Sequence, residues 1–179
     1  CALPIWIEAQ VARVIVGLTD PDENVNGKGI AELRKAGIEV IEGILEEKVT
    51  EQLTPYLHHR RTGKPWVVLK MALTLDGRTS AADGSSQWIT GEAARTDAHL
   101  LRARCDGILV GAQTVRSDNP SLTVRRVTGK DPIRIVLGIA PPDAAVHPCW
   151  EVDGDLEKIL QSLGQRGIVD LLVEGGANV

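Results

Sequence analysis

An apolar run with a single lysine in its middle most constrains the fold of this chain. Residues 66–75 read WVVLKMALTL, with Lys70 near the centre, and the run ends at the turn dipeptide Asp76-Gly77. Such a run is too short to span a membrane, and its bounding turn predicts a buried strand. Because a buried strand does not hold an unpaired ammonium group, Lys70 is expected to reach solvent or to meet an anion.

The residues after this run follow an alternating order of strand and helix. A polar loop with Ser86 and Trp88 precedes a helix that is expected to open after Thr90, and residues 108–110 begin another strand. Strand, loop, helix and strand within about sixty residues indicate an α/β unit of the kind that binds nucleotides.

The rest of the chain alternates in the same way. Apolar runs at 11–18, 38–41, 133–137 and 168–173 predict strands, and the patterns at 28–36, 46–61 and 156–163 predict helices. Pro55 should limit or kink the second of these helices. The basic, Gly- and Pro-containing segment 60–65 is the expected boundary between a domain at 1–62 and a domain at 63–179.

Composition excludes several classes of protein. A net charge of −4 and a pI near 5.6 argue against a general nucleic-acid binder. The sequence has no apolar run of about eighteen residues, so no membrane association is expected. Three widely spaced cysteines, without zinc-ligand spacing to the histidines, indicate reduced thiols in a cytoplasmic protein and predict no metal site.

The helix after Thr90 carries two stripes. The apolar stripe is expected to face the sheet and consists of Ala94, Ala98, Leu101 and Cys105. The second stripe consists of Arg95, His99 and Arg102, which suits an anion such as phosphate. Burial statistics favour the alternative, a solvated face paired with Glu92 or Asp97.

Two glycine turns follow expected strands. Gly111 leads into Thr114, and Glu174 stands at a strand tip before Gly175. Ligands of open α/β sheets collect at the carboxyl ends of strands, although each glycine turn alone could be a plain turn. Trp88 is more often a core residue than a cofactor platform. Spacing alone therefore predicts an α/β protein with a phosphate-bearing ligand at its strand tips.

Five segments, taken in order, resemble the reductase domain of the bifunctional riboflavin-biosynthesis deaminase/reductase family. They read LKMALTLDGRT, SQWIT, LLRA, TVRSDNPSLTVR and VEGGA. The resemblance implies a dihydrofolate-reductase-like fold and reduction, by NADPH, of a phosphorylated pyrimidine substrate, 5-amino-6-(5-phosphoribosylamino)uracil. The alternatives are another reductase of this fold and a truncated product without function.

The resemblance also implies roles for individual residues. The catalytic candidates are Lys70, Asp118 and Glu174. The cofactor contacts are Ala72, Trp88, Thr114, Asp118, Gly176, Ala177, Asn178 and Val179. The substrate contacts are Ser86, Arg102, Leu122, Arg125 and Glu174, with Arg102 expected on the phosphate. Arg95 and His99 receive no role and stay with the solvated face.

The first domain resembles the end of the partner deaminase domain, which has a cytidine-deaminase-like α/β fold. The resemblance lies in IEAQVARV, DPDENVNGKGI and AGIEV, whereas residues 1–6 are expected to be non-native. The H-x-E and the cysteine pair that would hold zinc are missing, so no deaminase activity is expected. The chain is interpreted as a fragment of a protein that is a homo-oligomer at full length.

Overall fold

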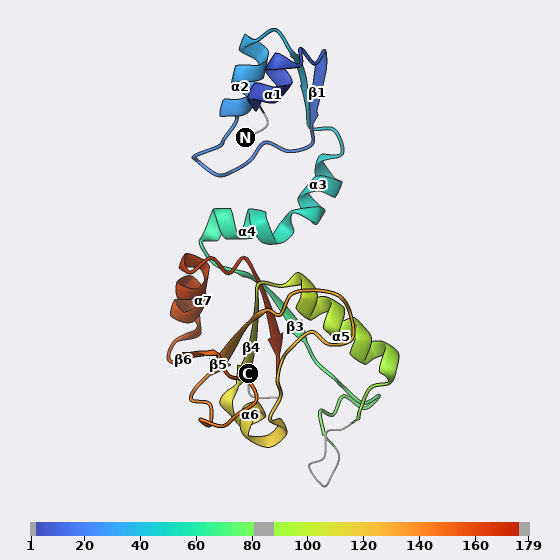
Figure 1. Cartoon of the computed structure of the whole chain (residues 1–179), viewed down its shortest axis with the longest axis vertical. Helices are drawn as coiled ribbons and strands as arrows, with labels where there is room; N and C mark the ends of the chain where they lie inside the picture. Colours follow the sequence, from blue (N-terminus) through green and yellow to red (C-terminus); the bar gives the residue numbers. More distant parts are fainter. Residues whose placement is uncertain (1–2, 81–87, 176–179) are drawn as a thin grey trace. The chain divides into compact units, whose positions relative to one another are not determined.

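The structure, a computed structural model, describes residues 3–80 and 88–175. The chain divides into two compact units, residues 1–63 and 64–179. The division falls within the basic segment 60–65, where glycine and proline interrupt the helical pattern before it and the strand pattern after it. Figure 1 shows the elements of each unit. No helix among the described residues is long and apolar enough to cross a membrane.

The first unit holds a two-stranded parallel sheet. β1 (Arg13–Val16) pairs with β2 (Glu39–Glu42) along their full lengths, and α2 (Lys28–Lys35) connects them. The other helices are α1 (Leu3–Glu8), α3 (Glu46–Gln52) and α4 (Thr54–Thr62). Pro55 lies in the first turn of α4, where its missing N–H breaks no helical bond. The helix expected over 46–61 is therefore two helices, as Pro55 suggested.

The second unit is built on a five-stranded sheet in which every pairing is parallel. Its strands are β3 (Trp66–Lys70), β4 (Gly107–Gly111), β5 (Ile133–Leu137), β6 (Trp150–Val152) and β7 (Asp170–Glu174). The spatial order is β3-β7-β4-β5-β6, so the last strand in sequence lies between β3 and β4. The sheet confirms the predicted α/β class.

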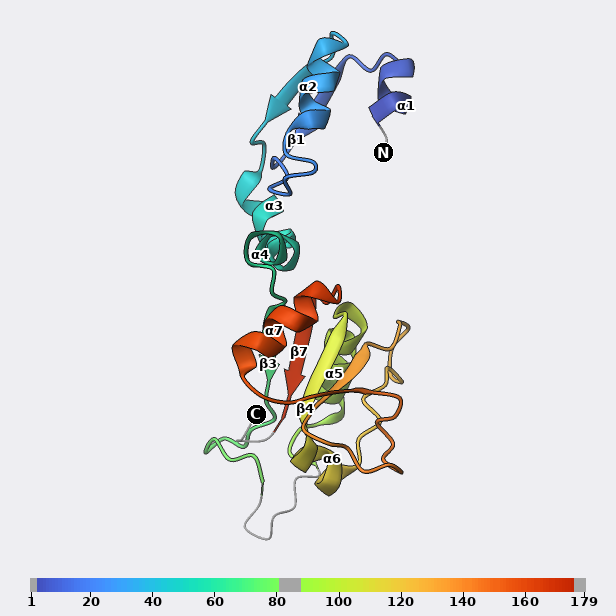
Figure 2. The ribbon, with the colours of Figure 1, turned by 90° about the vertical axis from the view of Figure 1, so that its left-hand side faces the viewer.

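Helices cover both faces of this sheet (Figures 1 and 2). On one face Ile108, Val110 and Leu172 pack with residues of α5 (Glu92–Arg104) and α6 (Ala112–Asp118). On the other face Leu109 and Leu171 pack against α7 (Leu156–Gln165). Successive strand residues point to opposite faces, so a strand buried on both faces must be apolar throughout.

Two expectations about the strands are wrong. The run at 66–75 is not a buried strand, because β3 stops at Lys70 and lies at the edge of the sheet. Leu69 is 60% exposed as a result. β6 was also not predicted, because three residues are too few to establish a strand pattern.

Two aspartates meet at the amino ends of β4 and β7. One Oδ of Asp106 accepts the backbone N–H groups of Val169 and Asp170, at 2.9 and 3.0 Å. The side chain of Asp170 lacks such donors, and its Oδ1 is buried without a hydrogen-bond partner. Burial, with a smaller contribution from Asp106, raises the pKa of Asp170 above its usual value. Asp106 therefore fastens the two strands, whereas ionised Asp170 weakens the fold.

We expect Asp170→Asn to raise the melting temperature near neutral pH. The folded state holds the Asp170 proton more tightly than the unfolded state does, so the wild type gains stability as pH falls through the raised pKa. The advantage of the variant should vanish once both states of the wild type are protonated. Thermal unfolding over a pH series measures this, and a constant difference between the two proteins would contradict it. As a control, Asp106→Ala should lose about 1–3 kcal/mol of unfolding free energy.

Candidate active site

A cavity of about 800 Å³ lies at the carboxyl ends of β3 and β7. It is lined by side chains from β3, α5, α6 and β7 and from the segment 119–126. The lining residues named by sequence reasoning are Lys70, Ala72, Trp88, Arg102, Thr114, Asp118, Leu122, Arg125 and Glu174. Ser86 and Gly176, Ala177, Asn178 and Val179 lie outside the described residues. The expected position of the site, at the strand tips, is thus where the cavity lies.

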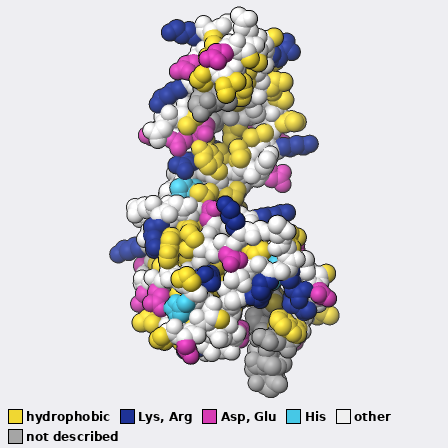
Figure 3. Space-filling model, in the orientation of Figure 1, with side chains coloured by type: hydrophobic (Ala, Val, Ile, Leu, Met, Phe, Trp, Pro, Cys, Tyr) yellow, Lys and Arg dark blue, Asp and Glu magenta, His cyan; other side chains and the backbone are white. Residues whose placement is uncertain are grey.

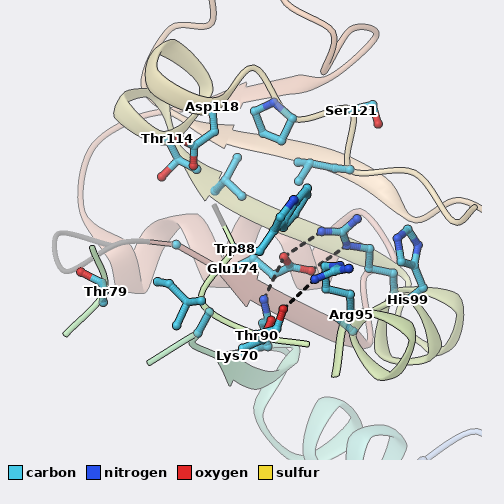
Figure 4. Close-up of a pocket in the computed structure, with 18 of the residues that line it drawn as sticks. Lys70, Thr79, Trp88, Thr90, Arg95, His99, Thr114, Asp118, Ser121 and Glu174 are labelled. Carbon is cyan, nitrogen blue, oxygen red and sulfur yellow. Dashed lines mark hydrogen bonds and ion pairs between the residues drawn. The ribbon is translucent and has the colours of Figure 1, made fainter. Parts of the chain in front are cut away.

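Glu174, the last residue of β7, is the central charge of the cavity (Figure 4). Arg102 of α5 binds it with two nearly parallel hydrogen bonds, Nε to Oε1 at 2.7 Å and Nη2 to Oε2 at 2.8 Å. The side chains of Arg102 and Glu174 are only 13% and 11% exposed. This bidentate geometry satisfies a buried carboxylate, which would otherwise be very costly.

Lys70 meets the same carboxylate from the neighbouring strand. The parallel register pairs Lys70 with Glu174, which brings Nζ to 3.8 Å from Oε2. The expected anion partner of Lys70 is therefore Glu174. Lys70 lines the cavity, and its side chain is 30% exposed. It can bind a ligand without leaving its ion pair.

The α6 side of the cavity has a different character. Thr114 and Asp118 line the cavity there, across from Lys70 and Glu174 in Figure 4. Asp118 is exposed, and the structure does not bring it to the charged group around Glu174. The three catalytic candidates therefore separate into the pair Lys70 and Glu174 and a distant Asp118.

Trp88 and Arg95 also line the cavity, and they contact each other. The indole of Trp88 is 71% exposed, so the expectation of a core tryptophan is wrong. The guanidinium of Arg95 lies 4.6 Å from the ring centroid, and its Nη1 donates to the Thr90 carbonyl at 2.6 Å. A flat, exposed aromatic face beside a cation suits a planar anionic ligand.

His99 is also not on a solvated face. Its residue is only 6% exposed, and its Nδ1 accepts the backbone N–H of Arg125 at 3.1 Å. Burial and the nearby guanidinium groups, Arg102 first, lower the pKa of His99. The solvated-face interpretation of this helix is therefore wrong. Leu101 and Cys105 do pack toward the sheet, whereas Ala94 and the buried Ala98 line the cavity.

Arg125 is an exposed cation of the segment 119–126 that lines the cavity. Its Nη1 donates to the hydroxyls of Ser121 and Thr123. Leu122 between them is 2% exposed and has a positive φ of 53°. The side chain of Leu122 anchors the segment in the core, and the hydroxyl bonds of Arg125 use only its Nη1.

Cationic side chains outnumber carboxylates around the cavity. Lys70, Arg95, Arg102, Arg125 and Arg126 line it, against Asp118 and Glu174. Lys and Arg side chains also gather near the start of α5 on the face drawn in Figure 3. Since only one of the five cations is fully matched by Glu174, the cavity favours an anion. The described residues contain no group of three or more His, Cys, Asp or Glu that could hold a metal.

Sequence reasoning missed Arg95 and His99 as members of the site. Their helical spacing with Arg102 did place all three on one stripe, which was the available indication. What the sequence did not show is the segment 121–126 that covers this stripe, because that segment has neither helical nor strand periodicity.

Comparisons with known proteins identify relatives of the chain. Residues 65–179 match the RibD C-terminal domain family. The riboflavin biosynthesis protein RibD of Chlamydia muridarum is 38% identical, and the match covers 98% of this chain and 57% of that protein. RibD of Mycobacterium tuberculosis H37Rv is 42% identical, over 95% of this chain and 53% of that protein. The chain thus spans little more than half the length of these relatives.

Solved structures agree with this result over both units. A diaminohydroxyphosphoribosylaminopyrimidine deaminase/5-amino-6-(5-phosphoribosylamino)uracil reductase from Thermotoga maritima matches with a TM-score of 0.85 and 35% identity, over 98% of this chain and 57% of that one. Acinetobacter baumannii RibD matches with a TM-score of 0.89 and 35% identity, over 98% and 58%. The dihydrofolate-reductase-like fold expected for the second unit is confirmed.

We expect the ion pair of Arg102 and Glu174 to be strongly coupled in unfolding experiments. Arg102→Met leaves a buried carboxylate with only the more distant Lys70, and should cost about 3 kcal/mol of unfolding free energy. Adding Glu174→Gln removes the stranded charge and should recover much of that loss. Urea unfolding of the two single variants and the double variant gives the coupling energy. Strictly additive losses would show that the two side chains do not depend on each other.

Proposed function

The chain belongs to the RibD C-terminal domain family, and on that premise we propose that its second unit supplies the active site of a riboflavin-biosynthesis reductase. The substrate is 5-amino-6-(5-phosphoribosylamino)uracil, the product is the 5-phosphoribitylamino compound, and the reductant is NADPH. One observation carries the proposal: a buried Arg102–Glu174 pair, joined by Lys70, lies in a cavity with surplus positive charge. Such a cavity suits a phosphorylated ligand with a polar ring.

The residues of the cavity fit a nicotinamide dinucleotide as well as the substrate. The exposed indole of Trp88 offers a flat surface, and Thr114 and Asp118 offer polar groups on the α6 side. We propose that these residues and Ala72 hold the cofactor, together with Gly176–Val179. When bound, the cofactor supplies the hydride that adds to C1′ of the opened, imine-like ribosylamine. The protein must then orient the substrate and provide one proton.

Lys70 is the proposed proton donor. Its ammonium lies at the cavity surface and keeps Glu174 as a partner at 3.8 Å, so a substrate nitrogen can approach it. Glu174 stays fixed by Arg102 and serves to hold both Lys70 and the substrate. Asp118, across the cavity, belongs with the cofactor contacts rather than with proton transfer.

The substrate phosphate is the ligand proposed for Arg102 and Arg125, with Ser86 and Leu122 as further substrate contacts. The two arginines differ in how many of their nitrogens are already hydrogen-bonded within the protein. Two nitrogens of Arg102 already donate to Glu174, and its Nη1 lies 3.4 Å from the Thr123 carbonyl. Within residues 3–80 and 88–175 the Arg125 side chain has hydroxyl partners alone, so its guanidinium has more capacity for a phosphate.

We propose that residues 1–62 belong to the deaminase part of the same protein, with residues 1–6 non-native. The support is the resemblance of three segments and the match to bifunctional relatives over nearly the whole chain. Without the H-x-E and the cysteine pair these residues do not deaminate, and zinc-dependent deamination by residues 1–179 would contradict this. We further propose that the full-length protein is cytoplasmic and forms a homo-oligomer. Light scattering tests the oligomeric state.

The reductase proposal is tested with the full-length protein that contains this chain. We expect it to oxidise NADPH in the presence of the phosphoribosylamino-uracil, with a higher kcat/KM than for NADH. Lys70→Met should lower kcat by about a hundredfold or more, with much smaller changes in both KM values. Equal use of the two nucleotides would refute the choice of cofactor. If the protein reduced a different substrate and not the phosphoribosylamino-uracil, it would be another reductase of this fold.

A second prediction concerns the phosphate. Arg125→Ala should lower kcat/KM for the phosphorylated substrate by about ten- to a hundredfold, because it removes a charge-assisted hydrogen bond. The dephosphorylated substrate should react poorly with both proteins and should barely distinguish them. Arg116→Ala is the matched control, since Arg116 is exposed on α6 and its side chain donates to Gln113. Equal losses for both substrates would show that Arg125 acts elsewhere than on the phosphate.

A further inference from the structure

The segment 121–126 forms one wall of the cavity without belonging to a helix or a strand. Its backbone therefore cannot be fixed by a regular hydrogen-bond ladder. Side chains hold it instead. The carboxylate of Asp131 accepts the N–H of Val124 at 2.7 Å, and Arg102 reaches the carbonyl of Thr123. Glu92 of α5 accepts from Arg126 at 2.9 Å.

The N–H of Arg125 is held by His99. The imidazole Nδ1 accepts this hydrogen bond at 3.1 Å, which requires that Nδ1 carry no proton. The proton of the neutral ring is then on Nε2. Since His99 is almost completely buried, the backbone N–H would have no ready substitute in water if the imidazole were removed.

The surroundings keep this imidazole neutral. Arg102 on α5 and Arg125 and Arg126 on the segment itself all disfavour a further positive charge at His99. Glu174 on β7 acts in the opposite direction, with the smallest effect of the causes that shift the His99 pKa. Its two oxygens are already matched by Arg102. Arg95, also on α5, lines the same cavity, where its guanidinium lies over the Trp88 ring.

We infer that His99 is a positioning residue for Arg125: through its neutral Nδ1 it fixes the backbone from which the Arg125 guanidinium reaches the anionic group of the substrate. This inference rests on the proposed function for the identity of that group. His99 does not touch the reacting atoms in this role. It sets the place of the arginine, as Leu122 does by anchoring in the core from the other side.

Protonation should undo the arrangement. A protonated Nδ1 is a donor that faces another donor, the N–H of Arg125, and it adds a charge among three arginines. The hydrogen bond is thus present above the lowered pKa of His99 and is lost as pH falls through it. A residue that only filled space would give no such dependence.

Two substitutions in the full-length protein distinguish the hydrogen-bond acceptor of His99 from the space that its side chain fills. His99→Asn keeps an acceptor near the position of Nδ1 and cannot be protonated. His99→Leu keeps apolar bulk and has no acceptor. Cofactor KM and melting temperature show whether each variant is folded.

The first measurement does not need turnover. Amide hydrogen exchange at Arg125 should be faster in His99→Leu than in the wild type by about three- to tenfold, and close to the wild-type rate in His99→Asn. The N–H of Val124, which bonds Asp131 instead, is the internal control and should be unchanged. Unchanged exchange at Arg125 in the Leu variant would overturn the inference, whether or not the protein reduces the proposed substrate.

The second measurement is the KM of the phosphorylated substrate between about pH 8 and pH 5. In His99→Leu this KM should be raised about three- to tenfold across the range, with kcat and cofactor KM nearly unchanged. In the wild type it should rise on acidification more steeply than in His99→Asn. The phosphate titrates identically for both proteins, so the difference between their profiles belongs to His99. Parallel profiles would overturn the inference even if the reductase activity is established.

Discussion

The bidentate ion pair between Arg102 and Glu174 is the interaction on which the rest of the site depends. A carboxylate that is almost completely buried at the tip of a central strand must be matched, and Arg102 matches both of its oxygens. The ion pair with Glu174 determines which face of α5 turns toward the cavity. The same carboxylate is the partner of Lys70 on the neighbouring strand. The ion pair also leaves the positive charge of Arg95 and Arg125, which no ion pair matches within the described part of the chain, available to a ligand, whereas Arg126 pairs with Glu92.

The polar face of α5 works as a support for the irregular wall opposite it. Glu92, His99 and Arg102 reach three successive parts of the segment 121–126: the Arg126 side chain, the Arg125 N–H and the Thr123 carbonyl. Each of these contacts is a single side-chain hydrogen bond and not part of a backbone hydrogen-bond ladder between strands. The shape of this wall is nevertheless determined by the helix, whose own position is set by apolar packing against the sheet.

Sequence reasoning could predict what depends on local pattern. Continuous apolar runs located β4 and β5, and the helical spacing of Leu101 and Cys105 identified the packing face of α5. It could not predict what depends on distant partners. Arg102 and Glu174 are 72 residues apart, and no local pattern joins them. His99 and Arg95 were assigned to solvent because nothing in the segment 121–126 indicates that it folds over them. β3 has the composition of a buried strand, yet β7 covers only one of its edges.

The place of β7 in the sheet imposes an order on folding. β3 pairs with β7 at Trp66↔Asp170, so about a hundred residues of chain separate the two strands. The pairing of β4 with β7 is also long-range, as at Gly107↔Leu171. During synthesis β3 and β4 must both wait, unpaired with each other, until β7 has left the ribosome, whereas β1 and β2 need only the short connection through α2. Contacts of such high sequence separation close slowly. The charged set at the strand tips is consequently among the last features to form, and exposed apolar strands persist until it does.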